Sequence, residues 1–125
     1  MSNMGDGVDL SILEGADVVS RAYGAGETIF VAEDDGDCMY IVRSGTVEIR
    51  YYGAVLDRIG RGGIFGEIAI IDGSTRSATA VAVADCELAE MTREGFLKLV
   101  QRKPTFALDV MKALAQRIRG MNESM

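Results

Sequence analysis

The sequence predicts a mainly β fold, an antiparallel sandwich or barrel that is followed by two helices. The chain has 15 glycines but only one proline, and ten of these glycines fall between residues 24 and 73. They separate short segments rich in valine, isoleucine and tyrosine, a pattern typical of antiparallel strands joined by tight turns. From residue 93 onward the apolar residues recur at helical spacing instead. The chain therefore divides into a β region and a helical region.

Seven segments are predicted to form strands. In one of them, Val47, Ile49 and Tyr51 alternate with Glu48 and Arg50, so the first three are expected to share a face. The glycine-centred stretches "RSGTV" and "YYGAV" are expected to form hairpin turns. Ahead of the first strand, "DLSILEGA" is expected to hold one short helix. The strand segments, in chain order, are 17–23, 27–31, 38–44, 46–52, 54–60, 77–84 and 86–92.

The first of the two C-terminal helices is predicted over about residues 93–103. Thr92 is a suitable N-cap, because its hydroxyl can accept a hydrogen bond from an otherwise unpaired amide of the first turn. Phe96, Leu97 and Val100 are expected to share the buried face of this helix.

A second helix is predicted over residues 105–121, after Pro104 interrupts the first. It is amphipathic and is expected to end near Gly120. With 48% apolar and 26% charged residues, the chain has the composition of a globular protein. We expect a single domain over residues 1–125, with the barrel at about 17–92.

Composition excludes several kinds of chemistry. The chain has no histidine, which removes Ser-His and Cys-His nucleophiles and most zinc sites. Cys38 and Cys86 lie far apart, form no CxxC motif and are too few for an all-cysteine iron–sulfur cluster. We expect them to be reduced thiols in the core. No catalytic residue, metal or cofactor is therefore expected.

Charge and hydropathy bear on partners and location. The net charge of −6 argues against nucleic acid as a partner. Residues 93–125 carry 7 basic and 3 acidic side chains, which fits either solvated helix faces or a surface for an acidic partner. No apolar run is long enough for a membrane span. The N-terminus has neither the basic nor the apolar region of a signal peptide, so a cytoplasmic location is expected.

The stretch "FGEIAIIDGSTRSATA", residues 65–80, is the main candidate for a site. One helical turn after Gly66 would expose backbone amides that can bind an anion. Arg76 follows Glu67 by nine residues and could face the same anion, as in a phosphate site. Glu67 would repel a phosphate, but a carboxylate beside one suits a ribose hydroxyl. The alternative is a surface ion pair between Glu67 and Arg76 that closes a loop.

This stretch resembles the phosphate-binding cassette of cyclic-nucleotide-binding domains, which occur in catabolite activators, kinase regulatory subunits and cyclic-nucleotide-gated channels. Upstream, "YGAGETIFVAEDDGDCMYIVRSGTVEI" is similar to the family's other signature, in which GE-x-IF precedes GD-x-x-Y and G-x-V. The two signatures stand in the family order, and the resemblance covers residues 18–119. It implies an eight-stranded antiparallel jelly-roll β-barrel, a short cassette helix and two C-terminal helices.

The resemblance also implies roles for individual residues. Arg76 would pair with the cyclic phosphate, and Glu67 would accept a hydrogen bond from the ribose 2′-hydroxyl, so the two would not be each other's main partners. Ser77 would bind the phosphate and could reach the base. The C-terminal helix would close as a lid, with Leu114 or Arg117 meeting the base. Backbone contacts would come from Gly66, Ile68 and Ala69, and apolar contacts from Ile49, Leu56, Ile59 and Phe65.

The ligand implied is cyclic AMP or cyclic GMP. Ser77 does not exclude cyclic GMP, but serine here is also common among cyclic AMP binders of the family, so cyclic AMP is favoured. Two positions depart from the family pattern: Glu33 replaces a frequent glycine, and Thr75 a frequent proline. The sequence contains no helix-turn-helix, kinase or pore segment, so it is expected either to stand alone and act on an unidentified effector or to be part of a larger protein.

Two other functions are alternatives to nucleotide binding. A ligand-independent interaction or dimerisation scaffold of the same fold would use the C-terminal helix to pair with a second copy or with another protein. A cupin-like metal enzyme could share the barrel, but the absence of histidine argues against it. The Glu67 and Arg76 pair favours the binding module, since a scaffold has no need of it.

Overall fold

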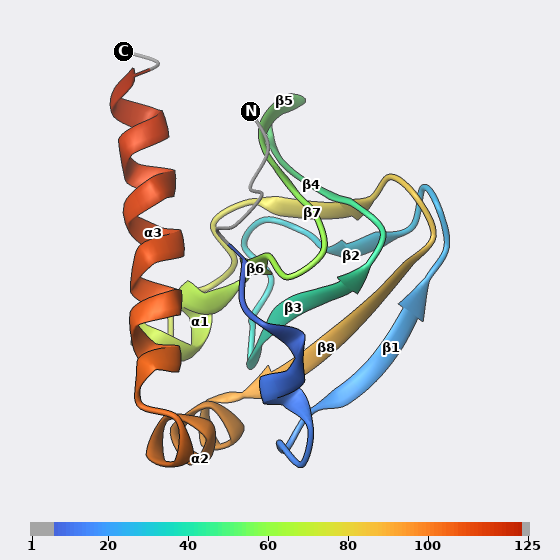
Figure 1. The fold of residues 1–125 in the computed structure, drawn as a ribbon. Helices are drawn as coiled ribbons and strands as arrows, with labels where there is room; N and C mark the ends of the chain where they lie inside the picture. The colour runs from blue at the N-terminus through green and yellow to red at the C-terminus, as the bar shows by residue number, and fades with distance from the viewer. Residues whose placement is uncertain (1–6, 124–125) are drawn as a thin grey trace.

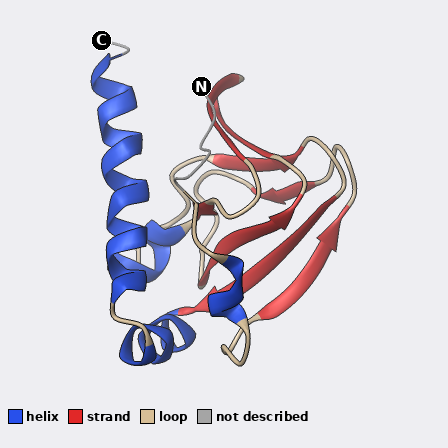
Figure 2. Ribbon diagram, viewed as in Figure 1, coloured by secondary structure: helices blue, strands red, loops and turns tan. Residues whose placement is uncertain are grey.

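Two four-stranded antiparallel sheets form the body of the protein (Figure 1). The computed structural model describes residues 7–123. The strand order is β1-β8-β3-β6 in one sheet and β2-β7-β4-β5 in the other. A short helix follows β6, and two helices close the chain, with α3 running alongside the barrel (Figure 2). The predicted eight-stranded jelly roll with a cassette helix and two C-terminal helices is confirmed.

The helices and strands lie close to the predicted segments. The 3-10 helix η1 forms within "DLSILEGA", as expected. The one strand without a predicted counterpart is β6, which has only two residues and pairs with β3. The elements in order are η1 Leu10–Leu13, β1 Val19–Tyr23, β2 Thr28–Phe30, β3 Cys38–Ser44, β4 Val47–Tyr51, β5 Ala54–Ile59, β6 Ile64–Phe65, α1 Glu67–Asp72, β7 Thr79–Ala82, β8 Cys86–Thr92, α2 Arg93–Arg102 and α3 Thr105–Glu123.

The core consists of two clusters separated by the sheet that contains β3. Met39 and Ile41 project from β3 toward the helices, while Tyr40 and Val42 project into the barrel, as the two-residue period of a strand requires. Both cysteines are free and buried, as predicted.

The β4–β5 hairpin corrects one detail of the prediction. Val47 is fully buried and Ile49 partly buried, but Tyr51 is exposed, because the hairpin projects beyond the other strands (Figure 1). On the opposite face Glu48 is covered by two arginines, with ion pairs of 2.8 Å to Arg50 and 2.7 Å to Arg58. The alternation itself is present, but burial ends before the strand does.

The C-terminal helices begin where they were predicted. The Thr92 hydroxyl accepts a hydrogen bond from the Gly95 amide at 3.1 Å and caps α2. Leu97, expected to be buried, is exposed, and Leu99 packs in the core instead. The error is one of helical phase, since Leu99 continues the stripe begun by Phe96 at a spacing of three residues. Gly120 does not end α3, which continues to residue 123.

Glu33 occupies a left-handed backbone conformation, with φ of 77°. Its amide donates a 2.7 Å hydrogen bond to the Arg76 carbonyl, so this conformation is fixed by the loop that carries Arg76. A residue with a Cβ pays about 1–2 kcal/mol in this region, and glycine does not. The greater entropy of glycine in the unfolded chain offsets part of this gain, so we expect Glu33→Gly to raise the free energy of unfolding by about 1 kcal/mol in urea denaturation.

The control for this prediction is Asp35→Gly in the same loop, where φ is not positive. It should lower the free energy of unfolding, by about 0.5–1 kcal/mol. Equal destabilisation by both substitutions would show that Glu33 carries no backbone strain.

Candidate functional site

Gly66 forms the sharp corner between β6 and α1. Its φ of 75° lies in the left-handed region. A Cβ there would lie 2.8 Å from Arg76 Nη1 and 3.2 Å from Tyr40 Cδ1, so a side chain is excluded by contact as well as by conformation. The short helix α1 ends at Asp72, and its C-cap Gly73 donates its amide to the Ala69 carbonyl. The cassette motif thus folds as the predicted helical turn.

Arg76 is buried beneath this corner, with only 5% of its surface exposed. Its Nη1 donates to the Gly66 carbonyl at 3.0 Å and its Nη2 to the Cys38 carbonyl at 2.8 Å. The guanidinium carbon lies 4.2 Å from the Phe30 ring centroid and 5.5 Å from that of Tyr40. The arginine is therefore held in one orientation by carbonyls and aromatic faces.

The positive charge of Arg76 has no negative partner among residues 7–123: no carboxylate lies within ion-pair distance. Burial raises the pKa of the Cys38 thiol and the pKa of the Tyr40 hydroxyl, so both neighbours stay neutral. The Nε of Arg76 is buried and has no hydrogen-bond partner in the part of the chain that the structure describes. A buried charge of this kind is costly unless something neutralises it, which marks the position as suited to an anion.

Gly36, in the GD-x-x-Y signature, packs directly on this guanidinium. A Cβ at this position would lie 2.5 Å from Arg76 Nε and 3.0 Å from the Ala69 Cβ. We expect Gly36→Ala to displace the Arg76 side chain and to cost about 1–3 kcal/mol of stability through overpacking. Thermal unfolding measures this loss of stability. Gly53→Ala is not a suitable control, because the φ angle of Gly53 is positive.

The matched control is Gly60→Ala, where nothing lies within 4 Å of the added carbon and φ is not positive. It should leave the melting temperature nearly unchanged. A Gly36→Ala protein as stable as the Gly60→Ala protein would contradict the assigned contact.

A small pocket of about 40 Å³ opens beside Arg76. Six of the residues predicted to bind the ligand line it, and Phe30, Thr75 and Ala78 complete the wall. The structure thus brings together residues separated by up to 28 positions in the sequence. The six are Ile49, Gly66, Ile68, Ala69, Arg76 and Ser77.

Three predicted apolar contacts lie elsewhere. Phe65 and Ile59 are buried in the barrel core, where Phe65 stacks on Tyr40 with ring centroids 4.9 Å apart. Leu56 is 60% exposed on β5 and does not line the pocket. Its position on the projecting hairpin explains this, because the hairpin extends past the pocket.

Glu67 faces the C-terminal helix and not Arg76. Only 1% of it is exposed, and its Oε2 accepts a 2.6 Å hydrogen bond from Arg117 Nη1. Arg117 also donates to Asp57 Oδ2 at 3.4 Å and to the Ile64 carbonyl at 2.7 Å. Glu67 Oε1 is buried without a partner among the described residues. The alternative of a Glu67–Arg76 ion pair is therefore wrong, and Arg117 joins α3 to the cassette.

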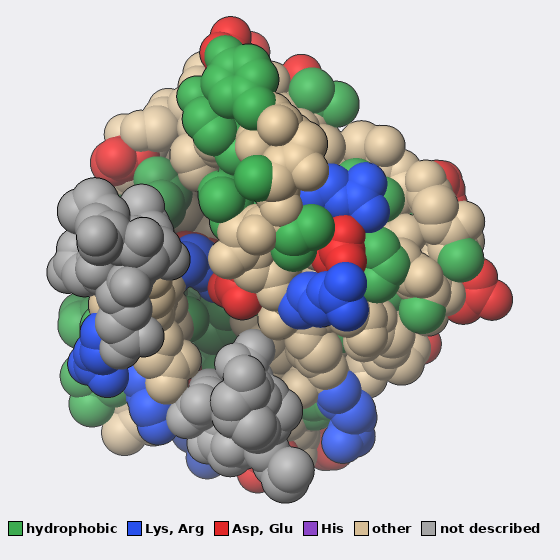
Figure 3. Space-filling view, turned by 90° about the horizontal axis from the view of Figure 1, so that it is seen from above, with side chains coloured by type: hydrophobic (Ala, Val, Ile, Leu, Met, Phe, Trp, Pro, Cys, Tyr) green, Lys and Arg blue, Asp and Glu red, His purple; other side chains and the backbone are tan. Residues whose placement is uncertain are grey.

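Leu114, the other predicted lid residue, is half-buried on the same helix. Viewed from the end at which α3 terminates, acidic and basic side chains meet between α3 and the β4–β5 hairpin (Figure 3). Apolar side chains cover the exposed hairpin tip, where Tyr52 is 90% exposed. Arg117 of α3 therefore forms ion pairs with Asp57 on β5 and with Glu67 on α1.

The sequence comparison decides the family. A profile described as "Cyclic nucleotide-binding domain" matches residues 20–103, which include both signatures and the whole cassette. The chain belongs to the cyclic nucleotide-binding domain family. Membership accounts for the arrangement of Gly36, Gly66 and Arg76, which come from the two signatures and meet in one place.

Several relatives of this cyclic nucleotide-binding domain are known. The "Cyclic AMP receptor protein" of Thermus thermophilus is 39% identical over 104 residues, which are 79% of this chain and 48% of the relative. The crystal structure of the Thermus thermophilus catabolite activator protein superposes with a TM-score of 0.80 at 34% identity, covering 98% of this chain and 61% of that one. "Lysophospholipase nte1" of Aspergillus terreus is 35% identical over 104 residues, only 7% of its length. The chain thus spans about half of the first relative and a small part of an enzyme.

The structure adds site residues of the domain that the sequence did not single out. Phe30, Gly36 and Cys38 surround Arg76, and Asp57 holds Arg117. Gly36 could have been found, since it belongs to a quoted signature, whereas a carbonyl contact such as that of Cys38 leaves no mark in the sequence. Within residues 7–123 no cluster of three or more potential metal ligands occurs. No described helix is both long and apolar enough to cross a membrane.

Proposed function

We propose that this domain is a regulatory module that binds a cyclic mononucleotide, with cyclic AMP favoured and cyclic GMP also compatible. The ligand would be held by the cassette and capped by α3, without catalysis. Family membership and the names of relatives support the class of ligand. The proposal for this chain depends on its own buried charges.

The unneutralised charge of Arg76 is the observation that carries the proposal. A buried guanidinium that faces only carbonyls, aromatic rings and neutral groups gains most from a ligand with a negative charge. The phosphate of a cyclic nucleotide supplies one such charge, and it can reach Arg76 through the pocket lined by Gly66 and Ser77. A scaffold without a ligand would have no reason to bury this charge.

Glu67 supplies the second part of the proposal. Arg117 occupies one carboxylate oxygen and leaves Oε1 buried and unpaired. A ribose hydroxyl is a donor that satisfies such an oxygen without adding charge. Arg117 already fixes the orientation of the Glu67 carboxylate. The Glu67 side chain can therefore bind the ribose and the α3 helix at the same time.

Binding requires the pocket to widen. A volume of about 40 Å³ is far below the roughly 300–1,000 Å³ typical of sites for small molecules. Ile68 and Ser77 on the rim are exposed, so the rim can yield at lower cost than the packed floor. We propose that the cassette helix and α3 move together on binding, since Arg117 links them.

Titration calorimetry with cyclic AMP and cyclic GMP tests the proposal. We expect saturable binding, with cyclic AMP bound more tightly. Glu67→Gln should weaken binding by about tenfold, because an amide is a poorer acceptor than a carboxylate. Deoxyribose ligand provides the matched control: 2′-deoxy cyclic AMP should bind wild type and Glu67→Gln alike. Absence of heat and of any melting shift with either nucleotide at millimolar concentration would exclude the function.

The output of the module is proposed to pass through α3. Its outward side is apolar, with Leu108, Met111 and Ile118 each more than half exposed. They recur at the spacing of a coiled-coil seam, so we propose that α3 pairs with a second copy or with an effector protein. Sedimentation with and without nucleotide tests this. If the protein sediments as a monomer and Leu108→Glu does not change its sedimentation, an effector protein is favoured over a second copy. A ligand-independent scaffold would use the same surface but show no nucleotide binding.

A further inference from the structure

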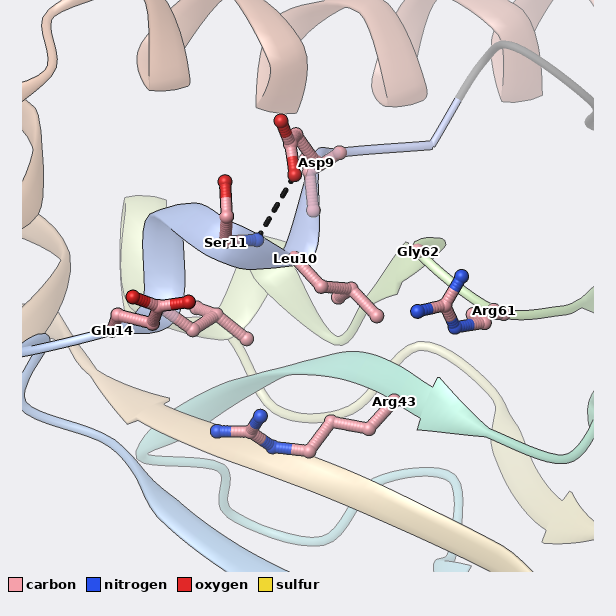
Figure 4. A pocket seen from close by; sticks show the side chains of 9 residues that line it. Asp9, Leu10, Ser11, Glu14, Arg43, Arg61 and Gly62 are labelled. Carbon is pink, nitrogen blue, oxygen red and sulfur yellow. Dashed lines mark hydrogen bonds between the residues drawn. The ribbon is translucent and has the colours of Figure 1, made fainter.

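A second, larger pocket lies on the other side of the β3 sheet from the nucleotide site. It has a volume of about 530 Å³ and opens between η1 and the turn before β6. Arg43 and Arg61 line it, and both guanidinium groups point toward η1 (Figure 4). The volume is in the range of sites that bind small molecules, which the cassette pocket is not.

Arg43 is aimed into this pocket by an irregularity in β3. The register between β3 and β8 shifts between Val42 and Ser44, so Arg43 is the extra residue of a β-bulge. Bulges re-aim side chains and are frequent beside sites. The Nε of Arg43 is buried and has no hydrogen-bond partner in the described part of the chain. Such an atom is costly to bury unless a partner is provided.

The second arginine is held beside the first by the backbone. The Gly62 amide donates to the Val42 carbonyl at 2.7 Å, and the Val42 amide donates to the Gly63 carbonyl at 2.9 Å. Arg43 and Arg61 therefore each stand next to a residue of these two hydrogen bonds, so their backbones are held close together. Among residues 7–123 neither arginine forms an ion pair, so both charges are available to a ligand.

Two carboxylates, those of Asp9 and Glu14, also line the pocket, but they lie along η1 and not beside Arg61. Asp9 accepts a 3.0 Å hydrogen bond from the Ser11 amide and caps η1, and this bond lowers the pKa of its carboxyl group. Figure 4 shows the Asp9 carboxylate turned toward Ser11 and Glu14 at the end of η1 away from Arg61. The pocket thus has an acidic rim along η1, and the Arg43 side chain extends toward the end of η1 that carries Glu14 (Figure 4).

The wall opposite the arginines is firmly built. Arg102 at the end of α2 donates to the Ile12 carbonyl at 2.9 Å and to the Glu14 carbonyl at 3.3 Å. Leu13 is buried in the core, and the Val8 amide donates to the Gly62 carbonyl at 2.8 Å. Hydrogen-bonded backbone therefore borders the pocket on two sides, so the pocket is not a gap between loose segments.

We propose that this pocket binds a small soluble oxyanion ligand, a phosphoryl or carboxylate compound, between Arg43 and Arg61. The planar fork of an arginine presents two donors to such a group, and the unpaired Nε of Arg43 becomes one of them. The acidic rim favours a ligand whose remaining part is neutral or donates hydrogen bonds. This site is separate from the cassette, and it stands whether or not the cassette binds a nucleotide.

The test is a titration of the full chain with pyrophosphate and, separately, with succinate, followed by NMR of backbone amides and arginine Nε–H groups. We expect saturable shifts at Gly62, Leu10 and the Nε of Arg43. Arg43→Met and Arg61→Gln should each weaken binding by about tenfold or more, the loss of one charge-assisted hydrogen bond. Saturation by pyrophosphate alone assigns the ligand to phosphoryl compounds, and saturation by succinate assigns it to carboxylates.

Two controls make the test decisive. Arg93→Gln makes the same change of charge at the exposed start of α2 and should leave binding unchanged. Arg43→Met keeps the length of the side chain and should not lower the melting temperature, which separates a binding role from a structural one. The proposal is overturned if neither anion saturates these signals, if the shifts centre on Gly66 and Ser77, or if Arg93→Gln weakens binding as much as Arg43→Met.

Discussion

Replacing Arg76 with lysine is expected to reduce cyclic AMP affinity by about 100-fold or more. Lysine keeps the positive charge but loses the guanidinium fork that donates to the Gly66 and Cys38 carbonyls. Two charge-assisted hydrogen bonds of about 1.5–3 kcal/mol each fix the group that faces the pocket, and a factor of ten in affinity corresponds to about 1.4 kcal/mol. Titration calorimetry measures the loss directly.

The control for Arg76→Lys is Arg21→Lys, since Arg21 is a surface residue that pairs with Glu90 on β8. It should bind cyclic AMP as the wild type does. Both variants should first be shown to be folded by the near-UV circular dichroism of the tyrosines, so that lost affinity is not lost structure. An Arg76→Lys protein that is folded and binds within about threefold of the wild type, a difference of under 1 kcal/mol, would refute the role of Arg76.

Replacing Arg117 with methionine is expected to cost about 3 kcal/mol of stability. The change removes the partner of Glu67, which is 1% exposed, and leaves a buried charge uncompensated. Breaking such a pair typically costs about 3–5 kcal/mol, and the lower value applies because a quarter of the Arg117 side chain is exposed. Urea denaturation measures the loss, which should come with weaker cyclic AMP binding as the Glu67 carboxylate loses its fixed orientation.

A double-mutant cycle separates the pair from other contacts of Arg117. Adding Glu67→Gln to Arg117→Met removes the buried charge, so the double variant should regain about 2 kcal/mol relative to Arg117→Met alone. Arg21→Met, which breaks the exposed pair with Glu90, is the matched control and should cost no more than about 1 kcal/mol. Additive effects of Glu67→Gln and Arg117→Met would show that the two side chains do not act as a pair.

Much of the fold follows from local signals. Glycine-bounded segments with two-residue alternation predicted seven of the strands, and Thr92 predicted the start of α2. The exception, β6, has two residues, too few for any periodicity to appear. The sequence predicted that Leu97 is buried, whereas Leu99 is buried instead. Only the position of the core decides which of two adjacent helical phases is buried.

The site was predicted less completely than the fold. The cassette motif and its resemblance to a family marked Gly66, Glu67 and Arg76, of which Gly66 and Arg76 are in contact while Glu67 faces α3. The partner of Glu67 is 50 residues away, and one of the two carbonyl partners of Arg76, that of Cys38, is 38 residues away. No local pattern specifies such contacts, although Arg117 was a candidate lid residue for a different reason.

By itself, the sequence determined the class of fold and the boundaries of most elements, since these depend on turn chemistry, capping and periodicity over a few neighbouring positions. The residues of the cassette were marked by the resemblance of their motif to a known family. Tertiary structure alone decided which charges are paired. It placed Arg117 on Glu67, left Arg76 without a carboxylate partner among residues 7–123, and opened the pocket of Arg43 and Arg61 at a bulge. The physical reason is that burial and pairing of a charge depend on what the folded chain brings around it, and elements distant in the sequence supply those surroundings.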